Sequence, residues 1–359
     1  MSKPHNVGGG LRSANTSDSS THGVRIVDRR PVPRFQREID LYYSTQGKRL
    51  KQRVVVALPT SFDDISLAVV NGISPPPPPN LDVPRGLHDA ARQSRRAMRE
   101  LAARLSSPYR HVSPMFDTRR AEPNNISHLL IECVPMALYA QDALGETVVS
   151  VYRKVVEPFR TLLNELEIEM VETSKRLEGR FVHVRGSRRL QIYDLFCMFD
   201  CPALSFFPDT YDRYTFPDRG SPPRIYLARR GARALLNNAE VERILQARGY
   251  ETIYMEDFPI REQMAIAQHA KHVVAVHGAA MGFLALNRGV STLLELFPPH
   301  TYHEHFATSL SRVDRYAVLL PAYDEAVPSR GWRALLAWKD APFAVDLEAL
   351  AQALDELTS

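Results

Sequence analysis

Two adjacent arginines follow a short apolar run in a position that suits phosphate binding. Arg229 and Arg230 come directly after Arg224–Ala228, which has the composition of a buried strand. A guanidinium group binds phosphate oxygens through paired hydrogen bonds. We therefore expect at least one of the two arginines to bind an anion and the other to face water.

A second candidate anion site is the sequence His277-Gly278-Ala279, which follows the apolar run Val273–Val276. In a parallel sheet, ligands bind at the carboxyl ends of the strands, where helix N-termini present free N–H groups. Gly278 lets the backbone approach a diphosphate, and His277 can donate a hydrogen bond to that diphosphate or to a ribose hydroxyl. The alternative is a histidine and a glycine that only form a turn, but their position at a strand end favours binding.

Asn237 and Glu295 are two further polar residues beside predicted elements. Asn237 precedes a predicted helix and either caps it or contacts a ligand. Glu295 lies inside the apolar run Leu293–Phe297, where a carboxylate without a partner would be costly. We expect ribose hydroxyls or a neighbouring arginine to bind Glu295.

A histidine and a glutamate share one helical face in the first half of the chain. Asn124 or Asn125 is suited to cap a helix that runs to Ala140, which places His128 and Glu132 four residues apart. Side chains of these types can act as general bases. The alternative is that His128 packs on the opposing half of the protein.

The elements expected around these residues alternate between strands and helices. In the first half, Arg53–Leu58 is predicted as a buried strand, Val148–Val151 as a strand and Pro158–Leu177 as a helix. The second half has four strands separated by three helices, at Arg224–Ala228, Asn238–Arg248, Thr252–Met255, Glu262–Ala270, Val273–Val276, Gly278–Leu286 and Thr292–Phe297. This pattern predicts an α/β protein with a doubly wound parallel sheet.

The length of the chain predicts two domains. Its 359 residues exceed the roughly 250 to 300 at which a single core stops growing. Residues 1–23 are rich in small polar residues and lack the apolar segment of a secretory signal, so we expect a disordered tail. We expect one α/β domain at 24–204, a second at 205–335, and a terminal helix within 336–359 that packs back across both halves.

Composition and missing motifs disfavour several classes of protein. The net charge of +4 is small for this length, so no nucleic-acid partner is expected. Three unpaired cysteines favour a cytoplasmic location, and no apolar run approaches the ~20 residues of a membrane span, although peripheral membrane contact stays open. The sequence lacks a P-loop, a Gly-x-Gly-x-x-Gly turn after a strand and a Gly-x-Ser-x-Gly elbow, which argues against a P-loop kinase, a dinucleotide enzyme and an esterase.

No metal site is expected. His303, Glu304 and His305 are adjacent, so they lack the helical spacing of a zinc protease. The sequence contains no Asp-x-Asp that could hold a divalent ion beneath a diphosphate. Arginine, histidine and helix N-termini would then have to stabilise the charge of a leaving diphosphate.

Several of these segments, in this order, resemble glycosyltransferase family 61. The resemblance is carried by Ile225–Arg230, Asn237, Glu262-Gln263, Val276–Ala280 and Leu294–Pro298, and more weakly by Asn125–Leu129 with Glu132, which is similar to the family's Asn-aromatic-x-His-Trp segment. The chain departs from the family pattern at Ser127, Leu129 and Phe283, where an aromatic, Trp and Asn are common. These departures bear on the choice of acceptor.

The resemblance implies a GT-B fold, in which two Rossmann-like domains face each other across a cleft. It also implies an inverting reaction with a UDP-sugar donor, no required metal or other cofactor, and a glycan or other hydroxyl acceptor, as in surface polysaccharide biosynthesis. The domain at 24–204 would be the acceptor side, and the domain at 205–335 would bind the nucleotide sugar. The candidate donor-binding residues are Arg229, Arg230, Asn237, His277, Gly278, Ala279 and Glu295.

An inverting transfer needs a base that deprotonates the acceptor hydroxyl. We hypothesise that His128 or Glu132 is this base and that domain closure brings it to the donor. Two other functions stay open. A nucleotide-sugar-modifying enzyme of another class would need the missing Gly-rich turn, and a non-catalytic polyanion-binding protein would use Arg180, Arg185, Arg188 and Arg189 with Arg92–Arg99.

Overall fold

The computed structural model describes residues 24–31, 35–45, 48–57, 64–74, 98, 102, 106–119, 124–186, 203–218, 220–298, 305–321 and 341–359. The expected tail at 1–23 and the basic stretch Arg92–Arg99, apart from Met98, lie outside these residues, as do His303 and Glu304.

The described residues form a mixed α/β structure with two largely parallel sheets, which confirms the expected fold class of two Rossmann-like halves. The first sheet has the order β1-β4-β9-β6-β7-β8, with β5 paired to β9. Its strands are β1 (Val24–Pro31), β4 (Asp64–Ser74), β5 (Tyr109–Arg110), β6 (Met115–Asp117), β7 (Val149–Tyr152), β8 (Met170–Glu172) and β9 (Leu177–Gly186).

The parallel part of the first sheet, β6-β7-β8, is connected by helices. A continuous helical stretch joins β6 to β7 and consists of α2 (Ile126–His128), the π-helical turn η1 (Leu129–Cys133) and α3 (Val134–Leu144). Helix α4 (Glu157–Glu165) joins β7 to β8. This alternation confirms the strand predicted at Val148–Val151.

The helix predicted at Pro158–Leu177 is wrong beyond Glu165. Glu167 has a left-handed backbone with φ of 54°, which stops the helix, and β8 then pairs with β7. The apolar residues Leu166 and Ile168 are both buried. Their spacing fits a helix face as well as a turn into a buried strand, so the sequence alone did not show the end of the helix.

The second sheet has the order β11-β10-β12-β13-β14-β2-β3. The four predicted strands are present as β10 (Arg224–Leu227), β11 (Glu251–Ile253), β12 (His272–Val276) and β13 (Val290–Leu296), and a fifth parallel strand, β14 (Val313–Leu319), extends them. The predicted helices are α5 (Asn238–Gln246), α6 (Ile260–His269) and the 3₁₀ helix η5 (Ala279–Leu286). The doubly wound arrangement is therefore confirmed.

A hairpin from the N-terminal part of the chain completes the second sheet. Strand β2 (Gln36–Thr45) pairs in parallel with β14, and β3 (Lys48–Ala57) forms the outer edge. The two sheets therefore do not divide the chain into two continuous pieces. The expectation that Arg53–Leu58 is a buried strand is wrong, because this edge strand is mostly exposed and Val55 retains 55% of its surface.

The terminal helix α9 (Leu347–Thr358) is capped by Asp346, whose carboxylate accepts hydrogen bonds from the N–H groups of Glu348 and Ala349. It packs against β2, β13, β14 and α5. The apolar face of α9 thus covers the second sheet and packs on β2, while Arg49 and Lys51 of β3 pair with Glu348 and Glu356 of the helix.

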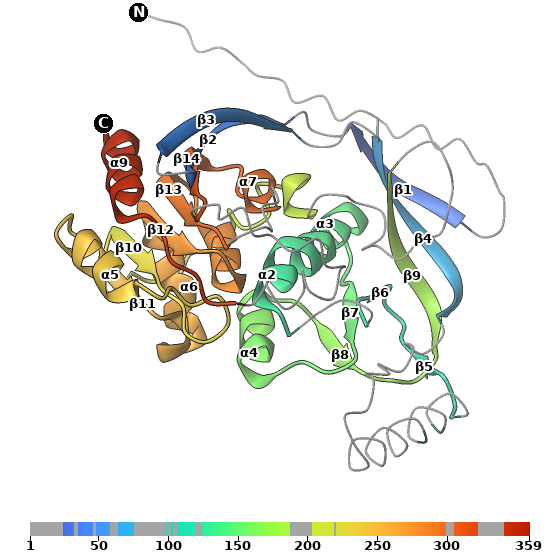
Figure 1. Ribbon diagram of the computed structural model, residues 1–359. Helices are drawn as coiled ribbons and strands as arrows, with labels where there is room; N and C mark the ends of the chain where they lie inside the picture. The colour runs from blue at the N-terminus through green and yellow to red at the C-terminus, as the bar shows by residue number, and fades with distance from the viewer. Residues whose placement is uncertain are drawn as a thin grey trace, which may run out of the picture.

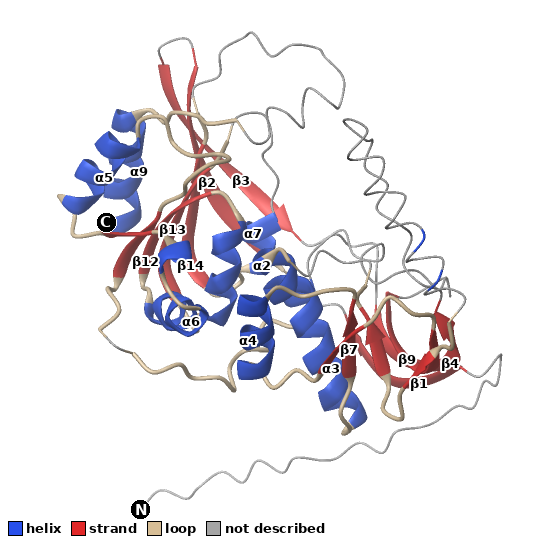
Figure 2. Cartoon of the chain, turned by 90° about the horizontal axis from the view of Figure 1, so that it is seen from below, coloured by secondary structure: helices blue, strands red, loops and turns tan. Residues whose placement is uncertain are grey.

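Helices fill the space between the two sheets. Figures 1 and 2 show α2, α3 and α4 of the first half between the sheets, beside α6 and α7 (His305–Ser309) of the second half. Helices α5 and α9 cover the opposite face of the second sheet (Figure 2). One buried apolar cluster includes residues of both sheets and of these central helices, so the two halves share a continuous core.

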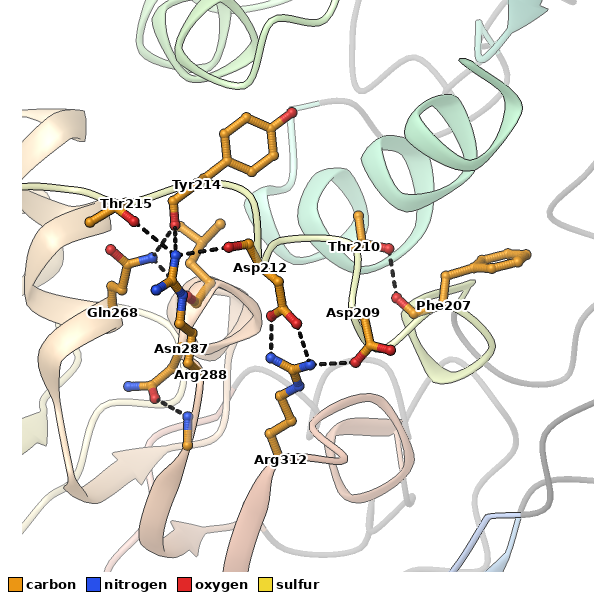
Figure 3. Close-up of polar contacts among 12 residues, drawn as sticks. Phe207, Asp209, Thr210, Asp212, Tyr214, Thr215, Gln268, Asn287, Arg288 and Arg312 are labelled. Carbon is orange, nitrogen blue, oxygen red and sulfur yellow. Dashed lines mark hydrogen bonds and ion pairs between the residues drawn. The ribbon is translucent and has the colours of Figure 1, made fainter. Parts of the chain in front are cut away.

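Two arginines bind residues 203–218, the segment that links the halves, to the second sheet. Arg288 donates hydrogen bonds to the carbonyl oxygen of Asp212 at 2.8 Å and to the hydroxyl of Thr215 at 2.8 Å. Arg312, at the start of β14, pairs with the carboxylates of Asp209 and Asp212 (Figure 3).

Two tyrosines of this segment attach it to the first half. The hydroxyl of Tyr211 donates to the carbonyl oxygen of Leu130 at 2.5 Å, and that of Tyr214 donates to the carbonyl oxygen of Leu166 at 2.8 Å. The linking segment therefore makes polar contacts with both halves and helps to hold them together.

Candidate functional site

The topological switch point of the second sheet lies between β10 and β12. The chain leaves β10 towards β11 on one side and later returns to β12 on the other side. Ligands of open parallel sheets bind where the strand order reverses, beyond the carboxyl ends of these strands. Arg229 follows β10 and His277 follows β12, so the sheet places both at this point.

Arg229 lies directly against the loop after β12. Its Nη1 atom donates to the carbonyl oxygen of His277 at 3.4 Å, and its Nε atom donates to the carbonyl oxygen of Ala232. A β-carbon added to Gly278 would lie 1.9 Å from Nη1 of Arg229. Gly278 has an extended backbone that any residue can adopt, so it is the approach of the guanidinium that requires glycine here.

His277 belongs to a buried chain of three polar side chains. Its Nδ1 atom is 2.5 Å from Oε1 of Glu295, and Oε2 of Glu295 accepts a hydrogen bond from the hydroxyl of Tyr316. Glu295 is 1% exposed, which makes these partners necessary for a charged carboxylate. The expectation of an arginine partner for Glu295 is corrected, since a histidine and a tyrosine bind it.

The imidazole of His277 is also held by aromatic rings. The ring centroid of Phe297 is 4.1 Å from that of His277, and the centroid of Phe306 is 5.7 Å away. These rings fix the histidine between the end of β12 and the start of η5, whose first residue is Ala279.

The second arginine of the pair has other partners. Arg230 forms two hydrogen bonds with the carboxylate of Asp257, at 2.7 and 2.8 Å, and its guanidinium lies 3.8 Å from the ring centroid of Tyr254. Of the two arginines, Arg229 is therefore the one against the His277 loop. Arg230 is half-exposed, in line with the expectation that one of them faces water.

Asn237 precedes α5, but its side chain does not cap the helix. Its Nδ2 atom donates to the carbonyl oxygen of Val345 at 2.8 Å, and its Oδ1 atom accepts from the N–H of Val345 at 3.2 Å. These paired bonds attach the segment before α9 to the loop after β10. Asn237 is therefore a link to the C-terminal segment rather than the helix cap considered from the sequence.

His128 and Glu132 lie together as their spacing predicted. Nδ1 of His128 is 2.9 Å from Oε2 of Glu132. The side chain of Asn125 caps the helix by accepting from the N–H of Ser127 at 3.0 Å, which confirms one of the two expected caps. The side chain of His128 keeps 33% of its surface and that of Glu132 keeps 16%, so the histidine is the more accessible partner.

The fold brings this pair towards the His277 loop. Helix α2 packs on η5, and a β-carbon added to Gly282 would lie 2.6 Å from the Cα atom of Ser127. His305 of α7 lies between the two histidines: its ring centroid is 6.1 Å from that of His128 and 5.1 Å from that of Phe306, which in turn contacts His277. Two histidine–carboxylate pairs, one from each half, therefore flank the contact between α2 and η5.

The positions that depart from the family pattern lie at this contact between the halves. Ser127 is 5% exposed, Leu129 is fully buried and Phe283 is 2% exposed. Their burial indicates that these residues fit the two halves together.

Three residues of the site were not recognised from the sequence. Tyr316 begins the apolar run Tyr316–Leu320, Gly282 lies in an apolar helical segment, and His305 was considered only as a metal ligand. A short apolar run with one tyrosine or one glycine has no feature that separates it from ordinary core. Gly282 matters because of its contact with the backbone of Ser127, which only the fold reveals.

Within the part of the chain that the structure describes, no three histidine, cysteine, aspartate or glutamate side chains gather as metal ligands would. None of the described helices is long and apolar enough to span a membrane. Of the arginines in the polyanion-binding alternative, Arg180 pairs with Glu146 at 2.6 Å, and the side chains of Arg185, Arg188 and Arg189 lie outside the described set.

A comparison with protein families matches residues 84–284 to the model described as Glycosyltransferase 61. The match spans more than half of the chain and includes His128, Arg229 and His277, whereas Glu295 and Tyr316 follow its end. A comparison with curated proteins found no match.

Proposed function

The chain belongs to glycosyltransferase family 61 and is a glycosyltransferase, and we propose that it transfers a sugar from a UDP-sugar to a hydroxyl acceptor with inversion at the anomeric carbon. The main evidence for the proposed donor site is the contact between Arg229 and His277 at the switch point of the second sheet. A ligand bound there lies at the carboxyl ends of β10 and β12.

Side chains and backbone at this switch point would bind the donor diphosphate. Arg229 supplies a charged group that suits phosphate oxygens, and the imidazole of His277 supplies a second hydrogen-bond donor. Gly278 and Ala279, where η5 begins, supply backbone close to the ligand. These groups would stabilise the negative charge that develops on the leaving diphosphate, so we propose that the reaction needs no metal ion.

The acceptor would be activated by His128. Because Glu132 binds Nδ1 of His128, the carboxylate orients the imidazole and stabilises the positive charge that forms when Nε2 takes a proton. This geometry supports His128 as the base and Glu132 as its positioning residue, a choice that the sequence left open. The location of His128 on α2, against η5, supports its approach to the donor.

The transfer would then proceed by direct displacement. The acceptor oxygen loses its proton to Nε2 of His128 and forms a bond to the anomeric carbon, while the bond from that carbon to the diphosphate oxygen breaks and its electrons leave with UDP. Attack from the face opposite the diphosphate inverts the configuration. We also propose a glycan acceptor, a role in surface polysaccharide synthesis and a cytoplasmic location.

The base is tested by comparing two variants in single-turnover and steady-state assays. His128→Ala should lower kcat by about 100-fold or more, and Glu132→Gln by about tenfold, since a general base contributes roughly 10²–10⁴ and its positioning residue less. Donor affinity should stay within about twofold of wild type in both variants. If neither variant loses about tenfold in kcat while the donor still binds, His128 is not the base.

A further inference from the structure

The hydroxyl of Tyr316, the carboxylate of Glu295 and the imidazole of His277 are joined by buried hydrogen bonds. Tyr316 extends from β14, Glu295 from β13, and His277 follows β12, so three neighbouring parallel strands each contribute one member. All three side chains are buried: Tyr316 is 5% exposed, Glu295 1% and His277 7%. The arrangement is therefore set by the sheet and shielded from water.

The carboxylate of Glu295 depends on both of its neighbours. Each of its oxygens has one partner, His277 Nδ1 for Oε1 and the Tyr316 hydroxyl for Oε2. A buried carboxylate that loses a hydrogen-bond donor is strongly destabilised as an anion. The Tyr316 hydroxyl thus helps to hold the Glu295 carboxylate in place, and Glu295 in turn orients the imidazole of His277 through Nδ1.

We infer that Tyr316 is a positioning residue for donor binding: it holds Glu295 against Nδ1 of His277, so that His277 meets the donor diphosphate through Nε2. This inference rests on the proposed function, because the ligand of His277 is the proposed diphosphate. Without the hydroxyl, Glu295 loses one of the two groups that hold it, and the imidazole of His277 loses its fixed orientation opposite the diphosphate.

A tyrosine suits this position because its ring and its hydroxyl have different partners. Its ring packs in the apolar cluster shared by the two halves, and its hydroxyl alone reaches the carboxylate. Tyr316→Phe removes that hydroxyl and keeps the ring. Tyr214→Phe is the matched control, since Tyr214 is buried in the same cluster and donates to the backbone carbonyl of Leu166, away from this chain of hydrogen bonds.

The chemical environment of the two ring nitrogens of His277 is measured first, without any ligand, by nitrogen NMR of protein labelled at histidine. The His277 signals are assigned with His277→Gln. Tyr316→Phe should shift both ring nitrogens of His277, and Tyr214→Phe should leave them in place. Unchanged His277 signals in Tyr316→Phe would overturn the inference whether or not the protein binds nucleotides.

The consequence for binding is measured next, as the dissociation constants of UDP and UMP. Tyr316→Phe should lower the preference for UDP over UMP by about fivefold or more, equivalent to about 1 kcal/mol, and Tyr214→Phe should change it by less than about twofold. If the NMR signals shift but wild type binds neither nucleotide, the proposed donor site fails and the positioning role stands. If wild type prefers UDP and Tyr316→Phe keeps the full preference, the positioning role fails and the donor site stands.

Folding of the variant is checked by its melting temperature. Should Tyr316→Phe melt far below Tyr214→Phe, Glu295→Gln gives a second measurement, because it removes the charge of the carboxylate that orients His277 through Nδ1 while conserving size. Glu295→Gln should then show the same loss of preference for UDP. An unchanged preference in a folded Glu295→Gln protein would overturn the inference.

Discussion

The backbones of Ser127 and Gly282 are in direct contact, to the extent that a β-carbon on Gly282 would lie 2.6 Å from the Cα atom of Ser127. Ser127 precedes His128 on α2, and Gly282 lies within η5, the helical segment that begins just after the His277 loop. The absence of a side chain at residue 282 therefore sets how closely the proposed base approaches the proposed donor site.

Gly282→Ala should separate α2 from η5. The added methyl group meets backbone atoms, which cannot rotate away as a side chain can, so we expect a loss of about 1–3 kcal/mol in the free energy of unfolding. The catalytic rate should fall more than the donor affinity, because the displacement moves His128 relative to the donor. Denaturant unfolding and steady-state kinetics measure the two effects.

Gly289→Ala is the control for this variant. Gly289 lies beyond the same helical segment, and a β-carbon there would meet no atom within 4 Å. Stability and rate should both stay close to wild type. Equal effects of the two substitutions would show that the contact with Ser127 does not matter.

Gly278→Ala should act through Arg229. The new β-carbon would lie 1.9 Å from Nη1 and 3.1 Å from Cζ, so the guanidinium must leave the His277 loop. We expect about tenfold weaker binding of UDP, or about 1.4 kcal/mol, with little change in melting temperature because the clash is with the end of a flexible side chain. Titration calorimetry measures the affinity.

The double variant Gly278→Ala, Arg229→Ala separates this explanation from a general disturbance of the loop. If the glycine acts only through the arginine, the double variant binds UDP as weakly as Arg229→Ala alone. Additive losses would contradict the assigned contact.

The attachment of α9 should weaken in acid. A hydrogen bond from Lys51 holds the pKa of Glu356 at about 2, below its ordinary value of 4.5, and Tyr42 donates to the same carboxylate. Because the folded pKa is lowered, Glu356 contributes stability above pH 4.5, and this contribution disappears as the pH falls towards 2. Glu356→Gln should therefore lose stability at pH 6 and differ less from wild type as the pH approaches 2.

Glu348→Gln provides the comparison for the acid prediction. Glu348 lies on the same helix and pairs with Arg49 at the surface, where its side chain is 73% exposed. Its replacement removes the same charge but should change the pH profile of unfolding little, since exposed pairs contribute little. A profile for Glu356→Gln that runs parallel to wild type over this range would refute the role of Glu356.

Much of the second half could be predicted because its signals are local. The apolar strands β10, β12 and β13 end at polar residues, and the helices between them begin and end near Asn237, Pro259 and Gly249, whose types mark helix boundaries. The pairing of His128 with Glu132 followed from the four-residue spacing on a helix. These features depend only on neighbouring residues in the chain.

The remaining features depend on distant partners. The hairpin β2–β3 pairs with β14 across more than 270 residues, so nothing near Arg53–Leu58 shows that this strand is an exposed edge. The end of α4 at Glu165 is decided by the pairing of β8 with β7, which overrides the local helix pattern. Tyr316 acquires its role only because Glu295 lies on the adjacent strand.

The most direct test of the donor site is thermal stabilisation by a panel of nucleotides and nucleotide sugars, with and without magnesium. Wild type is compared with Arg229→Ala, His277→Ala and Arg230→Ala, the last being the adjacent arginine that pairs with Asp257. A ligand at 100 times its dissociation constant stabilises by about 2.7 kcal/mol. We predict that UDP or a UDP-sugar raises the melting temperature of wild type and of Arg230→Ala, independently of magnesium, and that Arg229→Ala and His277→Ala lose this response. A wild-type protein that responds to no nucleotide, or an unchanged response in Arg229→Ala and His277→Ala, would contradict the proposed site.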